Sequence, residues 1–138
     1  MKKIICLDFD GVINSYKSGW TGIANLPDEP VPGALEWIEK IIMLYCDTPE
    51  SIDCIGKPLK DYELCIYSAR SKSFFGRRAM KKWLVKHGLD DRFLEVIKFP
   101  IKKPAAFITI DDRAIQFKGK FPKFEEITNF KPWNKKKV

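Results

Sequence analysis

With 138 residues, of which 45% are hydrophobic and 13% aromatic, the chain can form one domain with a substantial core but not two. We therefore expect a single domain over 1–138, and this composition excludes a disordered segment. The formal net charge of +7 favours polyanionic partners, without saying whether these are nucleic acids, nucleotides or smaller phosphates.

The chain shows no sign of export or membrane insertion. No apolar run approaches the roughly 20 residues of a membrane-spanning helix. The apolar stretch after Lys2 and Lys3 is only about four residues, shorter than the roughly 7–15 of a secretory signal. The four cysteines form no CxxC pair, which favours free thiols in a reducing compartment. We predict a cytoplasmic protein without a membrane partner.

The first half of the chain predicts a strand, a helix and a loop. Residues 2–7 resemble a short buried strand. Apolar residues then recur at helical spacing from Ala34 to Tyr45, with Pro32 near the helix start. Residues 49–61 contain two prolines and a glycine and predict a loop.

The second half continues the alternation. A second strand is predicted at 64–67, ending at Ser68, and a helix at 73–87, ending before Gly88. Shorter strands are predicted at 94–97 and 106–110. Such alternation indicates an α/β fold: a Rossmann-like three-layer sandwich with a central parallel sheet and helices on both faces.

Acidic residues follow two of these strands. Asp8 and Asp10 come directly after the first, and Asp111 and Asp112 follow the last. Because parallel strands end at one edge of the sheet, we expect these acids to meet there. Clustered carboxylates repel each other unless a cation is present, and a hard divalent ion, ordinarily Mg²⁺, prefers such oxygen ligands. Gly11 would let the backbone turn sharply and approach a ligand closely.

Four stretches resemble, in order, the motifs of the haloacid dehalogenase (HAD) superfamily of phosphohydrolases. They are DFDGVI at 8–13, Ser68 in IYSAR, Lys103 in KKP and the acidic pair in TIDDR. The resemblance spans Asp8 to about Arg113, which is most of the chain. It implies a HAD-like fold and a Mg²⁺-dependent phosphatase.

The resemblance also implies residue roles. Asp8 would attack phosphorus and form an aspartyl phosphate, and Asp10 would act as general acid and base. Ser68 would bind a phosphoryl oxygen, and a lysine would neutralise charge. Lys103 is the preferred lysine, with Lys102 as the alternative.

The resemblance also implies the ligands of the metal ion. The ion would be held by Asp8, by the backbone carbonyl of Asp10 and by one member of the acidic pair Asp111–Asp112. The choice between Asp111 and Asp112 stays open.

The substrate is expected to be a phosphorylated small molecule or a nucleic-acid end. Residues 14–31 are too short for a folded cap and predict a mobile flap over an open site, while 131–138 predict a solvated basic tail. Arg70 in SAR at 68–70 and Arg113 in DDR at 111–113 resemble the phosphatase half of polynucleotide kinase-phosphatases. The stretches PVPGALEWI at 30–38 and IDDR at 110–113 are similar to the 5′(3′)-deoxyribonucleotidases. Both arginines are candidate phosphate ligands. The oligomeric state is not predicted.

Other readings of the same residues stay open. The phosphatase could act on other small phosphorylated metabolites, or the chain could be a non-catalytic nucleic-acid or phosphate-binding module. A metal-dependent nuclease would also use clustered acids, but it would not need Ser68 or the lysine. A phosphate-sensing receiver would place its lysine after the acceptor aspartate, and here Lys103 precedes the second acidic pair.

Overall fold

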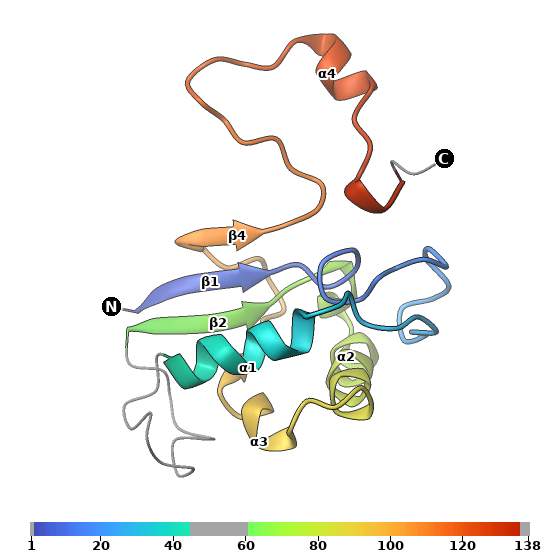
Figure 1. Ribbon diagram of the computed structural model, residues 1–138, viewed down its shortest axis with the longest axis vertical. Coiled ribbons are helices and arrows are strands. Elements are labelled where there is room, and N and C mark those ends of the chain that lie inside the picture. The colour runs from blue at the N-terminus through green and yellow to red at the C-terminus, as the bar shows by residue number, and fades with distance from the viewer. Residues whose placement is uncertain (1, 45–60, 136–138) are drawn as a thin grey trace.

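The computed structural model describes residues 2–44 and 61–135 (Figure 1). Four strands form one sheet in the order β3-β2-β1-β4, and all neighbouring strands are parallel. The strands are β1 (Lys3–Leu7), β2 (Tyr62–Ile66), β3 (Ile97–Lys98) and β4 (Ile108–Ile110). The predicted α/β fold with a parallel sheet is therefore confirmed.

Short helices connect and follow these strands. They are α1 (Ala34–Leu44), η2 (Ala69–Lys72), α2 (Phe74–Lys86), α3 (Asp91–Leu94), α4 (Phe124–Thr128) and η3 (Trp133–Lys135). None of the helices within the two described ranges has the length and apolar character needed to cross a membrane.

Most predicted elements agree with the structure to within two residues. The helix predicted at 73–87 is α2, whose N-cap Ser73 accepts hydrogen bonds from the amides of Phe75 and Gly76. The strand predicted at 94–97 is present, but its bounds are wrong: Asp90 caps the short helix α3, which includes Leu94, and the strand is only Ile97–Lys98. Almost all of the predicted loop at 49–61, and the end of the first helix at Tyr45, lie outside the described residues.

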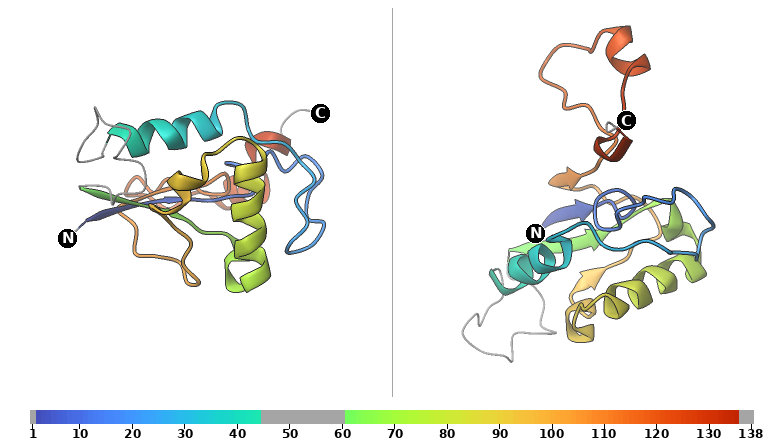
Figure 2. Two further views of the ribbon diagram at one scale, coloured as in Figure 1. Left: turned by 90° about the horizontal axis from the view of Figure 1, so that it is seen from below. Right: turned by 45° about the vertical axis from the view of Figure 1, so that its right-hand side comes forward.

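The helices that cover the sheet lie on one face of it, not on both as expected. The β1–α1–β2 and β2–α2–β3 crossovers run in the same direction along the sheet, so right-handed connections place α1 and α2 on the same face. These helices share one core with Ile5 and Leu7 of β1, and Figure 2 shows α1 along that face. The connection 99–107 between β3 and β4 contains no helix, since Pro100 and Pro104 interrupt it.

The flap, residues 14–31, is tied to the domain body. Two backbone hydrogen bonds join its ends. The Ser15 amide donates to the Glu29 carbonyl at 3.0 Å, and the Val31 amide donates to the Ile13 carbonyl at 2.8 Å. The Trp83 indole of α2 donates to the carbonyl of Asp28 at 2.9 Å. The flap therefore forms one wall of the domain.

The chain after β4 leaves the sheet and returns. The arm, residues 114–132, extends beyond the β4 edge and carries α4 (Figure 1). Its far end comes back to the first loop, where Trp133 donates to the carbonyl of Gly11 at 2.7 Å and the Asn134 amide donates to the carbonyl of Ser15 at 3.4 Å. The described part of the predicted basic tail is thus anchored to the domain.

Candidate metal and phosphate site

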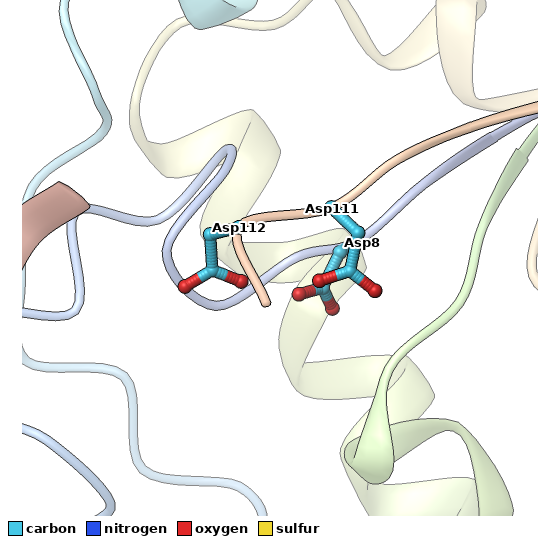
Figure 3. Close-up of side chains that lie close together, drawn as sticks. All are labelled: Asp8, Asp111 and Asp112. Atoms are coloured by element: carbon cyan, nitrogen blue, oxygen red, sulfur yellow. The ribbon is translucent and has the colours of Figure 1, made fainter. Parts of the chain in front are cut away.

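Three carboxylates meet at the carboxyl edge of the sheet. Asp8 follows β1, and Asp111 and Asp112 follow β4; each offers an oxygen within 4.8 Å of the others (Figure 3). Parallel pairing brings them together, because Leu7 lies opposite Ile110 and the Asp8 amide donates to the Ile110 carbonyl at 3.0 Å. The predicted meeting is confirmed for Asp8, Asp111 and Asp112, but it is wrong for the Asp10 carboxylate, which is not part of the cluster.

The cluster is electrostatically strained without a bound cation. Burial, a hydrogen bond with Asp112 and the charge of Asp111 raise the pKa of the Asp8 carboxyl from its ordinary 3.8 to about 8. Oδ1 of Asp112 is buried and has no hydrogen-bond partner among the described residues. Three carboxylates with one buried, unpartnered oxygen suit a hard divalent cation such as Mg²⁺.

Gly11 is required by the close approach of Asp112. Its φ of +86° lies in the region that favours glycine, and a Cβ there would overlap Oδ2 of Asp112. We expected Gly11 to allow approach to a ligand, and the structure adds that it makes room for a neighbouring carboxylate.

The Asp10 carboxylate lies outside the three-carboxylate cluster. Arg70 Nε donates to its Oδ2 at 2.9 Å and to its Oδ1 at 3.2 Å, and Asn14 Nδ2 donates to Oδ1 at 2.9 Å. Two donors from different segments therefore fix the orientation of this carboxylate. Any metal contact from Asp10 would have to come through its backbone, as expected.

Arg70 differs most from its expected role as a phosphate ligand. Its side chain is 1% exposed, and besides Asp10 it holds the flap, with Nη1 donating to the carbonyls of Gly22 and Ile23 at 2.5 and 2.9 Å. The ring of Trp20 lies 4.5 Å from the guanidinium carbon. Arg70 is thus a positioning residue that joins Asp10 to the flap.

Ser68 lies at the carboxyl end of β2, where it was expected, but its hydroxyl also forms hydrogen bonds within the protein. Its oxygen caps η2 by accepting from the Arg70 amide at 3.1 Å. Its proton is directed to Met80 Sδ at 3.6 Å. Because a thioether is a weak acceptor, rotation of the hydroxyl would release this proton to a stronger acceptor such as a phosphoryl oxygen.

The lysine and the second arginine are exposed. Burial raises the pKa of the Cys6 thiol and the charge of Lys103 lowers it, so Lys103 lies within electrostatic reach of β1. Among the described residues, neither Lys102 nor Lys103 forms an ion pair. The amide of Arg113 donates to Oδ1 of Asp111 at 2.9 Å, which leaves the Arg113 side chain in solvent.

Two site residues were not anticipated from the sequence. Asn14 is buried, and it orients Asp10 while its own Oδ1 accepts from the Tyr16 amide at 3.2 Å. Tyr16 has a φ of 60°, a strained conformation that costs roughly 1–2 kcal/mol outside glycine. Burial, then the charge of Asp10, raises the pKa of the Tyr16 phenol, while Arg70 and Arg113 lower it. The phenol therefore lies among the site's charged groups.

A basic groove lies between the flap and α2. Its volume is about 410 Å³, and it is lined by Ala24, Leu26, Phe75, Arg78, Ala79, Lys82, Trp83 and Lys86. Arg78, Lys82 and Lys86 are four residues apart and thus share one helix face. The exposed ring of Phe75 marks the end of the groove where α2 begins.

No family model, curated protein or solved structure matches the chain.

Proposed function

We propose that the protein is a magnesium-dependent phosphomonoesterase of the HAD superfamily that works through an aspartyl phosphate on Asp8. The observation that carries this proposal is the meeting of Asp8, Asp111 and Asp112 within 4.8 Å, with Asp10 held apart from them. We propose further that the one-sided sheet is a minimal HAD-like fold without a cap domain.

Asp8 would be the nucleophile. One of its oxygens would attack phosphorus, and the ester P–O bond would break to leave the phosphoryl group on Asp8. Mg²⁺, when bound by the three carboxylates, would neutralise charge on the transferring group. Because burial and the neighbouring acids disfavour ionised Asp8, the same cation would also favour the nucleophilic form.

Asp10 would move the protons. In its protonated form it would give a proton to the leaving oxygen, and the resulting carboxylate would take one from the water that attacks the aspartyl phosphate. Arg70 and Asn14 would keep Asp10 aimed throughout both steps. Ser68 and Lys103 would donate to the non-bridging oxygens.

A phosphatase screen tests this proposal. Nucleoside monophosphates, 3′- and 5′-phosphorylated oligonucleotides and sugar phosphates would be offered with Mg²⁺ to the wild type and to Asp8→Asn. Asp91→Asn is the matched control, because Asp91 is an exposed acid on α3. We expect Asp8→Asn to be inactive and Asp91→Asn to keep wild-type turnover. Turnover that survives in Asp8→Asn would exclude the nucleophile.

The basic groove favours nucleic-acid ends as the substrate. Helix α2 carries five basic residues and no acidic one: Arg77, Arg78, Lys81, Lys82 and Lys86. Like charges four residues apart destabilise a helix by roughly 0.2–0.5 kcal/mol per pair. A charge pattern that costs stability, beside an exposed aromatic ring, suits a single strand whose phosphates and bases bind together.

Charge removal tests the substrate class. Arg78, Lys82 and Lys86 would be replaced by Gln, and the control would carry Gln at Lys118, Lys120 and Lys123 of the arm. For a single strand, the plot of the logarithm of the binding constant against the logarithm of the salt concentration steepens by about 0.7 for each phosphate that the protein neutralises. The groove variant lacks three cations, so we expect it to bind oligonucleotides with a slope that is shallower by about 2. Its KM for nucleoside monophosphates should not change.

The other readings predict different results. If the groove variant leaves oligonucleotide hydrolysis and the salt slope unchanged, the substrate is a small phosphorylated metabolite. If no substrate is hydrolysed while salt-sensitive binding persists, the protein is a non-catalytic nucleic-acid-binding module.

A further inference from the structure

The β4 edge and the arm expose an unusual amount of apolar surface. Ten large apolar side chains between 107 and 133 are 38–89% exposed. They are Phe107, Ile108, Ile110, Ile115, Phe117, Phe121, Phe124, Ile127, Phe130 and Trp133. Single exposed apolar residues are ordinary, but ten of them within one segment of the chain favour an interaction surface.

The size of this surface matches a protein interface. A large apolar or aromatic side chain has roughly 150–250 Å² of surface, so these ten leave on the order of 1,000 Å² in solvent. A stable interface buries about 800 Å² on each partner. The arm and β4 together therefore offer enough apolar area for one complete interface.

The same chain carries a cavity that suits the arm's side chains. A cavity of about 250 Å³ lies between α1 and the β1–β4 part of the sheet, lined by Leu7, Val12, Ile13, Ala34, Trp37, Ile38 and Ile110. All of its lining side chains are apolar. Phe121 and Phe124, 89% and 74% exposed, are the most exposed aromatic rings of the described residues and would suit it.

The outer edge of the sheet is also open. Within the described ranges β4 pairs only with β1, so the other side of its backbone has no strand partner. Such an edge readily pairs with a second strand.

We propose that this surface binds a second copy of the chain. The arm of each copy would cover the β4 edge and fill the α1–β4 cavity of the other, so that the apolar residues and the cavity are used twice about a two-fold axis. A second copy is favoured because the exposed side chains of the arm and the cavity that would hold them belong to the same chain. The arm extends beyond β4, away from α1 and hence from its own cavity (Figure 1).

Mass in solution tests the pairing. Sedimentation velocity at about 10 µM protein should give twice the 16.0 kDa chain mass for the wild type. Phe121→Asp with Phe124→Asp should give the single-chain mass. The control is Phe74→Asp with Phe75→Asp, which removes two similarly exposed rings from α2 and should leave the pair intact. Thermal unfolding of each variant would show that the single chain still folds.

Salt dependence adds a check on the partner. Because each chain carries a net charge of +7, two copies repel each other, and raising the salt concentration should strengthen the pair. A wild type that sediments as one chain at every salt and protein concentration would overturn the proposal. So would an arm variant that remains paired, or a wild type that forms open-ended larger assemblies.

Cross-linking tests where the arm binds. A photoreactive phenylalanine analogue at position 121 would be activated in a mixture of unlabelled and ¹⁵N-labelled chains. We expect cross-links to the peptide that contains Trp37, joining one labelled to one unlabelled chain. Cross-links found only within single chains would show that the arm covers its own cavity and would overturn the proposal. Neither experiment depends on phosphatase activity, so the proposed function can fail or stand separately.

Discussion

The raised pKa of Asp8 predicts an unusual pH dependence of stability for the metal-free protein. The pKa of this carboxyl is about 8 when folded and 3.8 ordinarily, so between these values the folded state holds a proton that the unfolded state has released. Stability therefore falls as pH rises from about 4 to 8, the reverse of the usual behaviour of a paired carboxylate.

The magnitude follows from the shift. The shift from 3.8 to about 8 corresponds to at most about 6 kcal/mol, at about 1.36 kcal/mol for each pKa unit. Because Asp8 is partly exposed and solvent screens its neighbours, we expect a loss of about 3 kcal/mol across this range.

Urea unfolding in a chelator, at a series of pH values, measures this loss. Asp8→Asn cannot ionise and should flatten most of the profile, whereas Asp91→Asn should leave it unchanged. Adding Mg²⁺ to the wild type should restore stability at pH 8, since a cation bound only by the folded state stabilises it. If metal-free wild type and Asp8→Asn lost stability in parallel as pH rises, the cluster would not be the strained centre inferred here.

Three further changes test the surroundings of the cluster. Gly11→Ala should lower the free energy of unfolding, measured by urea titration, by more than the roughly 1–2 kcal/mol that a left-handed backbone costs, because its Cβ would also overlap Asp112. Gly33→Ala is the control: Gly33 has a φ of +85° but open space around it, so this variant should show the backbone cost alone. Arg70→Gln should destabilise by about 3–5 kcal/mol, since it leaves a carboxylate without its buried partner, and should lower kcat in the phosphatase assay. Trp133→Phe removes the bond to the Gly11 carbonyl and should cost about 1 kcal/mol by thermal unfolding.

Each of these results has a contrary outcome. Equal losses for the two glycine variants would show that Asp112 moves freely. Arg92 pairs with Asp90 at an exposed position, so Arg92→Gln should cost much less stability than Arg70→Gln. An equally small loss for Arg70→Gln would contradict its positioning role. No loss for Trp133→Phe would mean that the far end of the arm is not held at the site.

The strand ends could be predicted because their patterns are local. One apolar run stops at Asp8 and another stops at Asp111, which places both acids at one edge of any parallel sheet. Helix α2 could also be predicted from the sequence, since Ser73 and Gly88 mark its two ends.

Other features of the fold and the site could not be predicted, because most of them depend on contacts between segments that are distant in the sequence. Arg70 appeared to be a phosphate ligand because a charged residue beside a motif serine is ordinarily exposed, and only the packing of the flap shows that it is buried against Asp10, sixty residues earlier. The second helical layer failed to form because Pro100 and Pro104 fall in the connection that would have carried it. The strained backbone of Tyr16 has no counterpart in the sequence pattern.

The proposed function depends on the phosphorylation of Asp8. Rapid acid quenching of the wild type during turnover, followed by reduction with tritiated borohydride, would convert an aspartyl phosphate to labelled homoserine. We predict label at position 8, dependent on Mg²⁺ and absent from Asp8→Asn. Turnover without label at position 8, or with label at another acid, would show that Asp8 is not the nucleophile.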